Sequence, residues 1–267
     1  MALFTTTSNY QINWEQFPGL VPQTTLFLHG NLASNRWWMP TVEHLQAQGK
    51  DKAGSVICVE FRGCGQSQAP KSEADVTMKA FAQDFIDLVR SQNWGKINLV
   101  GHSTGGLIAA YMLALAPELF NKAYLLDPVG PEGVQFDNNM IAAFEAMKQD
   151  KNLTATVIGS TIHNNNAESS FFKNIIVEDA FAAVKTVGHL VLKALDGFNI
   201  VEPLKAVENP VKVVHGEFDK LLPVEASQLL AKTVKNGTFE TLPSCGHCGN
   251  VENTALFVKD FSAFLYK

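Results

Sequence analysis

Short apolar runs rich in β-branched residues recur along the chain, and each is followed by a glycine-rich turn and a stretch with helical periodicity. Such runs are typical of buried strands. Strand, helix and strand at this spacing predict right-handed crossovers and a mostly parallel central sheet flanked by helices, which is an α/β fold. The predicted strands are residues 25–28, 55–59, 97–100, 123–126, 211–214 and 238–242.

The stretch from 75 to 91 shows the helical pattern clearly. Its apolar residues recur at intervals of three and four, as they do on one face of a helix that packs against a sheet. Its charged residues fall between them, on the face that we expect to meet water. The apolar positions are Met78, Phe81, Phe85, Leu88 and Val89, and the charged positions are Asp84, Asp87 and Arg90.

The alternation of strands and helices is interrupted once. Between Pro131 and about Glu208 no run predicts a strand, whereas 139–148 and 178–195 show helical patterns. An insertion of this length predicts a helical cap over the carboxyl edge of the sheet, where open α/β sheets bind ligands. We therefore predict an α/β core formed by residues 1–130 and 209–267, and a helical cap subdomain formed by residues 131–208.

Composition narrows the classes of partner. A formal net charge of −5 and a pI near 5.8 give no basic footprint for nucleic acid or for an anionic membrane. A small uncharged molecule is therefore the expected partner, and the sequence leaves the oligomeric state open. The first residues show no basic leader followed by an apolar stretch, and nowhere do 18 apolar residues run together. We expect a soluble, cytoplasmic protein.

Two of the four cysteines lie in the sequence Cys-Gly-His-Cys at 245–248. This spacing occurs in thioredoxin-like redox sites, but there it follows a strand near the front of a small βαβ domain, whereas here it lies about twenty residues from the C-terminus. No second Cys/His pair at ligand spacing indicates a zinc site. We expect free thiols, no metal and no cofactor.

Residues 97–106 carry the strongest chemical signal, because a buried strand runs into Gly101-x-Ser103-x-Gly105 and then into a helical stretch. A serine on such a sharp turn projects its Oγ above the sheet, and the flanking glycines let the backbone pass without a clash. The helix behind the serine adds free N–H groups and the positive end of its dipole. Ser103 is therefore the candidate nucleophile.

With this motif the chain resembles the α/β-hydrolase family, in particular its capped esterase branch, over almost its whole length. His29-Gly30-Asn31 is similar to the oxyanion loop of that family. Residues 59–67 are similar to its D-x-R-G-x-G-x-S turn, with Glu60 where Asp is usual. The glutamate is a conservative departure that we expect to be structural.

A serine hydroxyl needs a base to take its proton and a carboxylate to orient that base. Of seven histidines, His247 follows the last predicted strand in a Gly-His pair, where the family has its base. Asp219 ends the turn after strand 211–214, at the family's acid position. Asp127, at the end of the strand before the insertion, is the rival acid, since some members of the family use that position. The other histidines are assigned structural or surface roles, and His29 is expected to shape the oxyanion loop.

The resemblance also implies an oxyanion hole made of two backbone N–H groups, those of Asn31 and Thr104. The Asn31 side chain is a candidate third donor, although an asparagine after glycine is equally typical of a turn.

A serine nucleophile excludes the branches of the family that attack through aspartate, which leaves acyl transfer to water. The candidate pocket residues are apolar, and the chain has only three arginines with no cationic cluster in the cap. An uncharged carboxylic ester is the preferred substrate. The alternatives are a carbon–carbon bond hydrolase or thioesterase on the same triad, and a non-catalytic small-molecule receptor. The pocket candidates are Trp37, Trp38, Phe136, Met140, Phe144, Met147, Phe171, Phe172 and Phe181.

Overall fold

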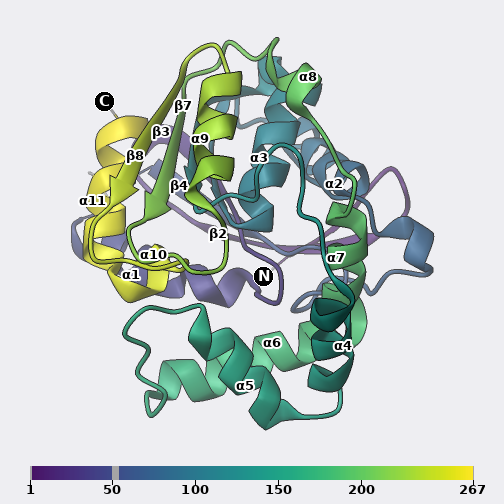
Figure 1. Cartoon of the computed structure of the whole chain (residues 1–267). Helices are drawn as coiled ribbons and strands as arrows, with labels where there is room; N and C mark the ends of the chain where they lie inside the picture. Colours follow the sequence, from purple (N-terminus) through teal and green to yellow (C-terminus); the bar gives the residue numbers. More distant parts are fainter. Residues whose placement is uncertain (1, 50–53, 267) are drawn as a thin grey trace.

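The computed structural model describes residues 2–49 and 54–266, and its centre is one sheet of eight strands within those residues (Figure 1). The strand order is β1-β2-β4-β3-β5-β6-β7-β8. Strands β3 to β8 are parallel, and β2 joins this parallel part by antiparallel pairing with β4. The strands are β1 (Ala2–Thr5), β2 (Gln11–Phe17), β3 (Val21–Leu28), β4 (Gly54–Val59), β5 (Ile97–His102), β6 (Phe120–Leu126), β7 (Val211–Gly216) and β8 (Gly237–Leu242).

The predicted α/β class and mostly parallel sheet are confirmed, and the six predicted strands correspond to β3 to β8. Strands β1 and β2 were not predicted. They form an antiparallel extension at one edge of the sheet, where most of their side chains are exposed or half-buried. An edge strand of this kind lacks the continuous apolar run that identifies a buried parallel strand.

Helices cover both faces of the sheet. On one face α1 (Met39–Ala47) and α11 (Thr254–Leu265) pack on side chains such as Cys58 of β4. On the other face lie α2 (Met78–Ser91), α3 (Thr104–Leu115) and α9 (Val224–Thr233), whose buried side chains belong to the same apolar cluster as the alternate β4 residues Ile57 and Val59. The core therefore has two apolar layers separated by the sheet.

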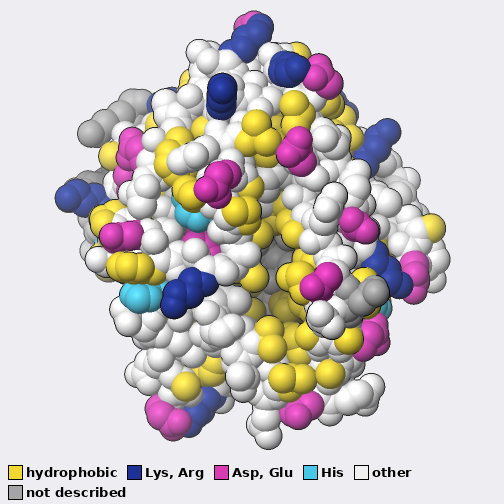
Figure 2. Space-filling view, in the orientation of Figure 1, with side chains coloured by type: hydrophobic (Ala, Val, Ile, Leu, Met, Phe, Trp, Pro, Cys, Tyr) yellow, Lys and Arg dark blue, Asp and Glu magenta, His cyan; other side chains and the backbone are white. Residues whose placement is uncertain are grey.

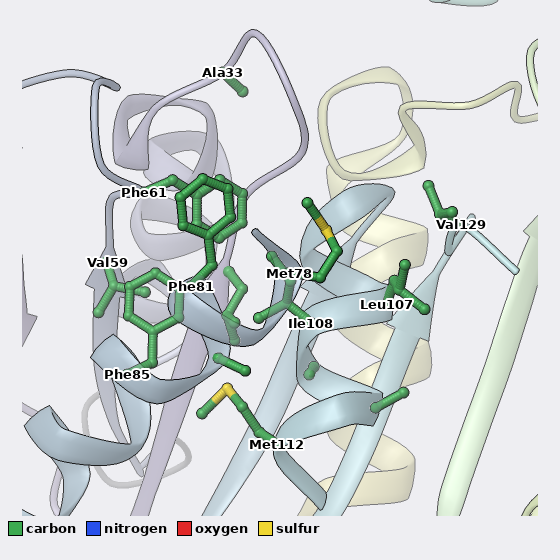
Figure 3. Close-up of a cluster of buried hydrophobic side chains, with 14 of the residues drawn as sticks. Ala33, Val59, Phe61, Met78, Phe81, Phe85, Leu107, Ile108, Met112 and Val129 are labelled. Carbon is green, nitrogen blue, oxygen red and sulfur yellow. The ribbon is translucent and has the colours of Figure 1, made fainter. Parts of the chain in front are cut away.

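The apolar stripe of α2 is buried as its periodicity predicts (Figure 3). The ring of Phe81 stacks on that of Phe61, with 5.2 Å between ring centroids and 9° between planes. Phe85 lies against the same ring at 5.5 Å. Phe61 is the second residue after β4, so this cluster fixes the end of β4 against α2.

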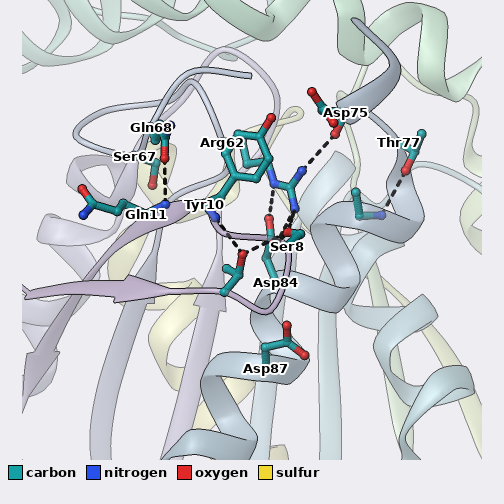
Figure 4. A network of polar contacts seen from close by, with 12 residues as sticks. Ser8, Tyr10, Gln11, Arg62, Ser67, Gln68, Asp75, Thr77, Asp84 and Asp87 are labelled. Atoms are coloured by element: carbon teal, nitrogen blue, oxygen red, sulfur yellow. Dashed lines mark hydrogen bonds and ion pairs between the residues drawn. The ribbon is translucent and has the colours of Figure 1, made fainter. Parts of the chain in front are cut away.

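Of the three charged residues of α2, Arg90 is exposed as expected, but the two aspartates are not, because the segment before β2 crosses that part of the helix (Figure 4). Asp84 is 1% exposed, and the Arg62 guanidinium donates to it from Nε and Nη2, each at 2.6 Å. Asp87 is also buried and accepts a hydrogen bond from the Thr7 amide at 3.1 Å. The prediction was wrong for both aspartates because periodicity within one helix carries no information about a segment some eighty residues away.

Between β6 and β7 the described chain forms helices and no strand. In Figure 1 the helices of residues 138–183 lie below the sheet, on the side to which β7 and β8 point, whereas the short helix Val201–Leu204 lies at the opposite end, against α3. We call residues 131–208 the cap. Within it, residues 131–200 return to their starting point, because Ile200 N donates to Pro131 O at 2.8 Å and Val134 N to Leu195 O at 3.3 Å. The elements are α4 (Asn138–Met147), α5 (Lys151–Ser160), α6 (Val177–Ala183), α7 (His189–Leu195), α8 (Val201–Leu204) and the π-helical turns η4 (Phe172–Ile176) and η5 (Val184–Gly188).

The remaining short elements are the turns η1 (Asn35–Trp38), η2 (Glu73–Asp75) and η3 (Pro117–Leu119) and the helix α10 (Gly249–Glu252). Over the residues described, no helix combines the length and apolar character that crossing a membrane would require.

Candidate active site

Ser103 occupies the turn between β5 and α3 with backbone angles φ 54° and ψ −122°. A residue with a Cβ rarely adopts a positive φ, so this turn is strained and needs its surroundings to hold it. The Ser103 amide donates to Leu126 O at 3.0 Å, and the Ser103 carbonyl accepts from Val129 N at 3.1 Å. Strand β6 and the segment after it thus fix both peptide groups of the predicted nucleophile.

The two glycines of the motif are required by close contacts. A Cβ on Gly105 would lie 2.4 Å from the carbonyl oxygen of Leu28, and one on Gly101 would lie 2.4 Å from that of Gly105. Both obstacles are backbone atoms, which cannot turn away. The spacing Gly-x-Ser-x-Gly is therefore the condition under which α3 can begin this close to β3 and β5.

His247 and Asp219 are hydrogen-bonded, with 2.8 Å between His247 Nδ1 and Asp219 Oδ2. The Asp219 side chain is fully buried, and its Oδ1 accepts from the Leu221 amide at 2.7 Å. Burial alone would raise the pKa of Asp219, but the hydrogen bond and charge of His247 outweigh it and hold the pKa below its usual value. The carboxylate is thus ionised beside the imidazole. No hydrogen bond within the described residues joins the rival, Asp127, to His247.

Two groups that the sequence did not identify hold the His247 loop. The Glu252 carboxylate accepts hydrogen bonds from the amides of Gly246 and Cys248, at 2.5 and 2.9 Å. It therefore fixes the backbone on both sides of His247. Burial lowers the pKa of His102 to about 3, which keeps its ring neutral, and its Nε2 lies 2.8 Å from the His247 carbonyl oxygen. His102 adjoins the motif serine, which was the only signal for its importance.

The predicted oxyanion loop lies against the nucleophile, since a Cβ on Gly30 would lie 3.1 Å from the Ser103 Cβ. Within the described residues, the amides of Asn31 and Thr104 donate no hydrogen bond to the protein, so both N–H groups remain for a ligand. His29 shapes the loop as expected: its Nδ1 lies 2.7 Å from Gly30 O, and burial lowers its pKa to about 4.

The Asn31 side chain joins the oxyanion loop to the cap. Its Nδ2 donates to Gly188 O of the cap at 3.0 Å, and its Oδ1 accepts from the Leu32 amide at 3.0 Å. The first contact links the loop to η5 and the second is a turn within the loop, while the role of a third donor stays a prediction. Sequence alone could not distinguish this from the donor role, because Gly188 lies 157 residues away.

Ser103 and His247 line the same cavity, of about 140 Å³, between the core and the cap. An apolar cavity of about this size holds a benzene molecule. No hydrogen bond reaches Ser103 Oγ from the part of the chain that is described. Of the described residues that line the cavity, none is Asp, Glu, Lys or Arg, and Figure 2 shows hydrophobic side chains around the hollow between core and cap.

About half of the predicted pocket residues line the cavity. Those that line it are Trp37, Phe136, Met140 and Phe144. Those that do not are Trp38, Met147, Phe171, Phe172 and Phe181, of which Trp38 is buried between Phe27 and Phe257 on the α1 and α11 side of the sheet. The lining residues that were missed include Val157, Ile158, Leu192, Leu195, Leu221 and Leu222.

The two cysteines beside His247 are free and buried. Burial raises the pKa of Cys245 to about 12 and that of Cys248 well above its usual value. A redox dithiol needs an accessible thiolate with a lowered pKa, so the Cys-Gly-His-Cys sequence does not form such a site here.

Comparison with known proteins agrees with this geometry. A family model described as the alpha/beta hydrolase fold matches residues 25–254. The "Putative non-heme chloroperoxidase" of Synechocystis sp. is 28% identical, covering 85% of this chain and 86% of its own. The 2-hydroxymuconate semialdehyde hydrolase of Pseudomonas sp. is 22% identical, covering 80% and 77%. An esterase from Exiguobacterium antarcticum superposes with a TM-score of 0.84 over 99% of both chains, at 19% identity.

Proposed function

The chain belongs to the α/β-hydrolase family, and on that premise we propose that it is a serine hydrolase that cleaves small uncharged carboxylic esters through an acyl-enzyme. Relatives and structural neighbours with several activities share this fold, so the fold does not decide between them. The proposal rests on the side chains around Ser103.

In the proposed reaction Ser103 Oγ attacks the ester carbonyl while His247 Nε2 takes the hydroxyl proton. Asp219, hydrogen-bonded to Nδ1, keeps the imidazole in the required tautomer and stabilises the imidazolium. The imidazolium then gives its proton to the departing alcohol. Water, deprotonated in turn by His247, attacks the acyl-enzyme; the acyl–oxygen bond then breaks, His247 returns the proton to Ser103 Oγ, and the acid leaves.

The tetrahedral intermediate carries a negative oxygen, and the unused amides of Asn31 and Thr104 are the proposed donors to it. The start of α3 adds the positive end of a helix dipole at the same place. Each such donor is worth on the order of 3 kcal/mol of transition-state stabilisation.

The single observation that carries the ester proposal is the absence of charged side chains among the described residues that line the cavity. An anionic product of aromatic ring cleavage, the substrate class of the carbon–carbon alternative, would leave its carboxylate there without a cation, at a high desolvation cost. An uncharged ester needs only the apolar wall and the two amides. We expect the enzyme to work in the cytoplasm, where cysteines stay reduced, since its cysteines are free thiols. The proposed reaction uses no cofactor.

The test is hydrolysis of p-nitrophenyl acetate and butyrate by purified protein and by Ser103→Ala. We expect turnover by the wild type and loss of at least about 10³-fold in the variant. Ser160→Ala, which removes the hydroxyl of an exposed serine in α5, is the matched control and should keep full activity. Tight binding of the ester without turnover would favour the receptor alternative, and cleavage of a ring-cleavage product in preference to esters would favour the carbon–carbon hydrolase.

A further inference from the structure

Asp127 lies directly after β6 and is fully buried, although the proposed reaction gives it no role. Its Oδ1 accepts a short hydrogen bond, 2.6 Å, from the Gly216 amide at the end of β7. Its Oδ2 is also buried, and no hydrogen-bond donor within the described residues reaches it. An ionised oxygen that is buried without a hydrogen-bond donor costs free energy. The observed surroundings therefore raise the question of whether this carboxyl is charged or protonated.

The neighbour of Asp127 is another carboxyl. Carboxylate oxygens of Asp127 and Asp219 and a ring nitrogen of His247 all lie within 4.8 Å of one another. Asp219 already has donors, namely His247 at one oxygen and the Leu221 amide at the other. Two buried carboxylates this close cannot both be ionised, and the one with more donors keeps the charge.

We propose that Asp127 is a neutral carboxylic acid at the pH at which the enzyme works, and that its O–H donates to Asp219, which makes it a positioning residue of the proposed triad. This inference rests on the proposed function, because it concerns the same acid. The proton on Asp127 provides the partner that its buried oxygen otherwise lacks. It also draws negative charge from Asp219, the partner of His247.

The electrostatic surroundings of Asp127 also favour its neutral form. Burial, and then the charge of Asp219, raise the pKa of Asp127 well above its usual value. Glu252 of α10 adds a further negative charge. On β7, His215 faces both acids, with Nδ1 3.6 Å from Asp127 Oδ1 and Nε2 3.8 Å from Asp219 Oδ2, but burial lowers its pKa and favours the neutral ring. The neighbours thus supply no cation that would ionise Asp127.

Infrared spectroscopy tests the protonation without relying on activity. Near neutral pH we expect the stretching band of a protonated carboxyl in the wild type and in inactive Ser103→Ala, and its loss in Asp127→Asn. Asp260→Asn is the matched control, since that carboxylate is paired with Lys212 at 2.9 Å, and it should leave the band unchanged. A band of equal intensity in Asp127→Asn and wild type, or none in the wild type, would overturn the proposal.

The dependence of kcat/KM on pH tests the positioning role. Asn at 127 can still donate to Asp219 and accept from Gly216, so Asp127→Asn should keep activity within about twofold and an unchanged profile. Asp127→Leu removes the donor, so the acid limb should move up by about half a pH unit or more, since Asp219 becomes the stronger base. An unshifted limb in a folded Asp127→Leu protein would refute this role. Absence of ester hydrolysis in the wild type would refute the proposed function instead and leave the infrared result intact.

Discussion

Buried neutral histidines surround the candidate nucleophile, and their burial makes folding stability depend on pH. Burial lowers the pKa of His29 to about 4 and that of His102 to about 3, whereas an unfolded histidine titrates near 6.5. Between these values the unfolded chain binds protons that the folded protein does not. The contribution of these two histidines to stability is therefore fully present above about pH 6.5 and decreases as the pH falls toward 4.

We expect each of the two histidines to cost about 2 kcal/mol of stability between pH 7 and pH 5, measured as urea unfolding free energies. His29→Gln should make the change in stability between pH 7 and pH 5 smaller by about 2 kcal/mol than in the wild type, because glutamine carries no titrating group. His44→Gln, on α1, is the control and should leave the wild-type change as it is. The same pH-dependent change in His29→Gln as in the wild type would contradict the expectation.

The buried pair of Arg62 and Asp84 permits another test at the residue scale. Arg62→Leu leaves the Asp84 charge buried without its partner, so we expect a loss of about 3–5 kcal/mol in urea unfolding. Arg90→Leu is the matched control, because Arg90 and Glu118 are 52% and 61% exposed, and it should cost less than about 1 kcal/mol. Equal effects of the two substitutions would show that burial of the pair is not what matters.

At the scale of elements, a buried carboxylate of the cap forms hydrogen bonds with the core. Asp179 of α6 accepts from Ser34 Oγ at 2.7 Å and from Arg36 Nε at 3.1 Å, and both donors lie at η1, next to the oxyanion loop. Asn31, whose Nδ2 donates to Gly188 O of the cap, lies only three residues before Ser34 in the chain. The position of the oxyanion loop and that of the cap are therefore coupled.

Asp179→Ala should loosen this attachment, because two donors lose their acceptor at a cost of about 2–3 kcal/mol. We expect faster hydrogen exchange in α6 and a KM raised several-fold, with little change in the exchange of β5. Glu178 is also in α6, and its ion pair with Lys151 is exposed. Glu178→Ala should therefore change neither the hydrogen exchange of α6 nor the KM. Unchanged exchange in Asp179→Ala would mean that the contacts of Asp179 do not hold the cap in place.

The sequence predicted those elements and residues whose signals are local. Strands β3 to β8 carry short runs of apolar and β-branched residues, and Ser103 lies in a motif whose glycines are set by contacts with adjacent segments. Asp219 and His247 required the resemblance to a family. The roles of Glu252, His102 and the Asn31 side chain could not be predicted, because each depends on which backbone atom lies opposite after folding, and for His102 that atom is 145 residues away.

At the scale of the whole molecule, net charge and cavity chemistry lead to a prediction about ionic strength. A net charge of −5 and a cavity without charged lining among the described residues provide no steering for an uncharged ester. We expect kcat/KM for such an ester to change less than about twofold between low salt and about 0.5 M NaCl. A steep decrease with salt would indicate instead that a charged substrate is attracted to the site.

The cap leaves and rejoins the core at one place, where Ile200 meets Pro131 and Leu195 meets Val134. The entropy of closing a loop grows only slowly with its length, so a neck of this kind tolerates insertions and deletions beyond it. Natural selection can therefore lengthen, shorten or replace the cap while the groups that hold Ser103 stay as they are. A change of substrate preference in this lineage then requires new walls for the cavity and no new reaction centre.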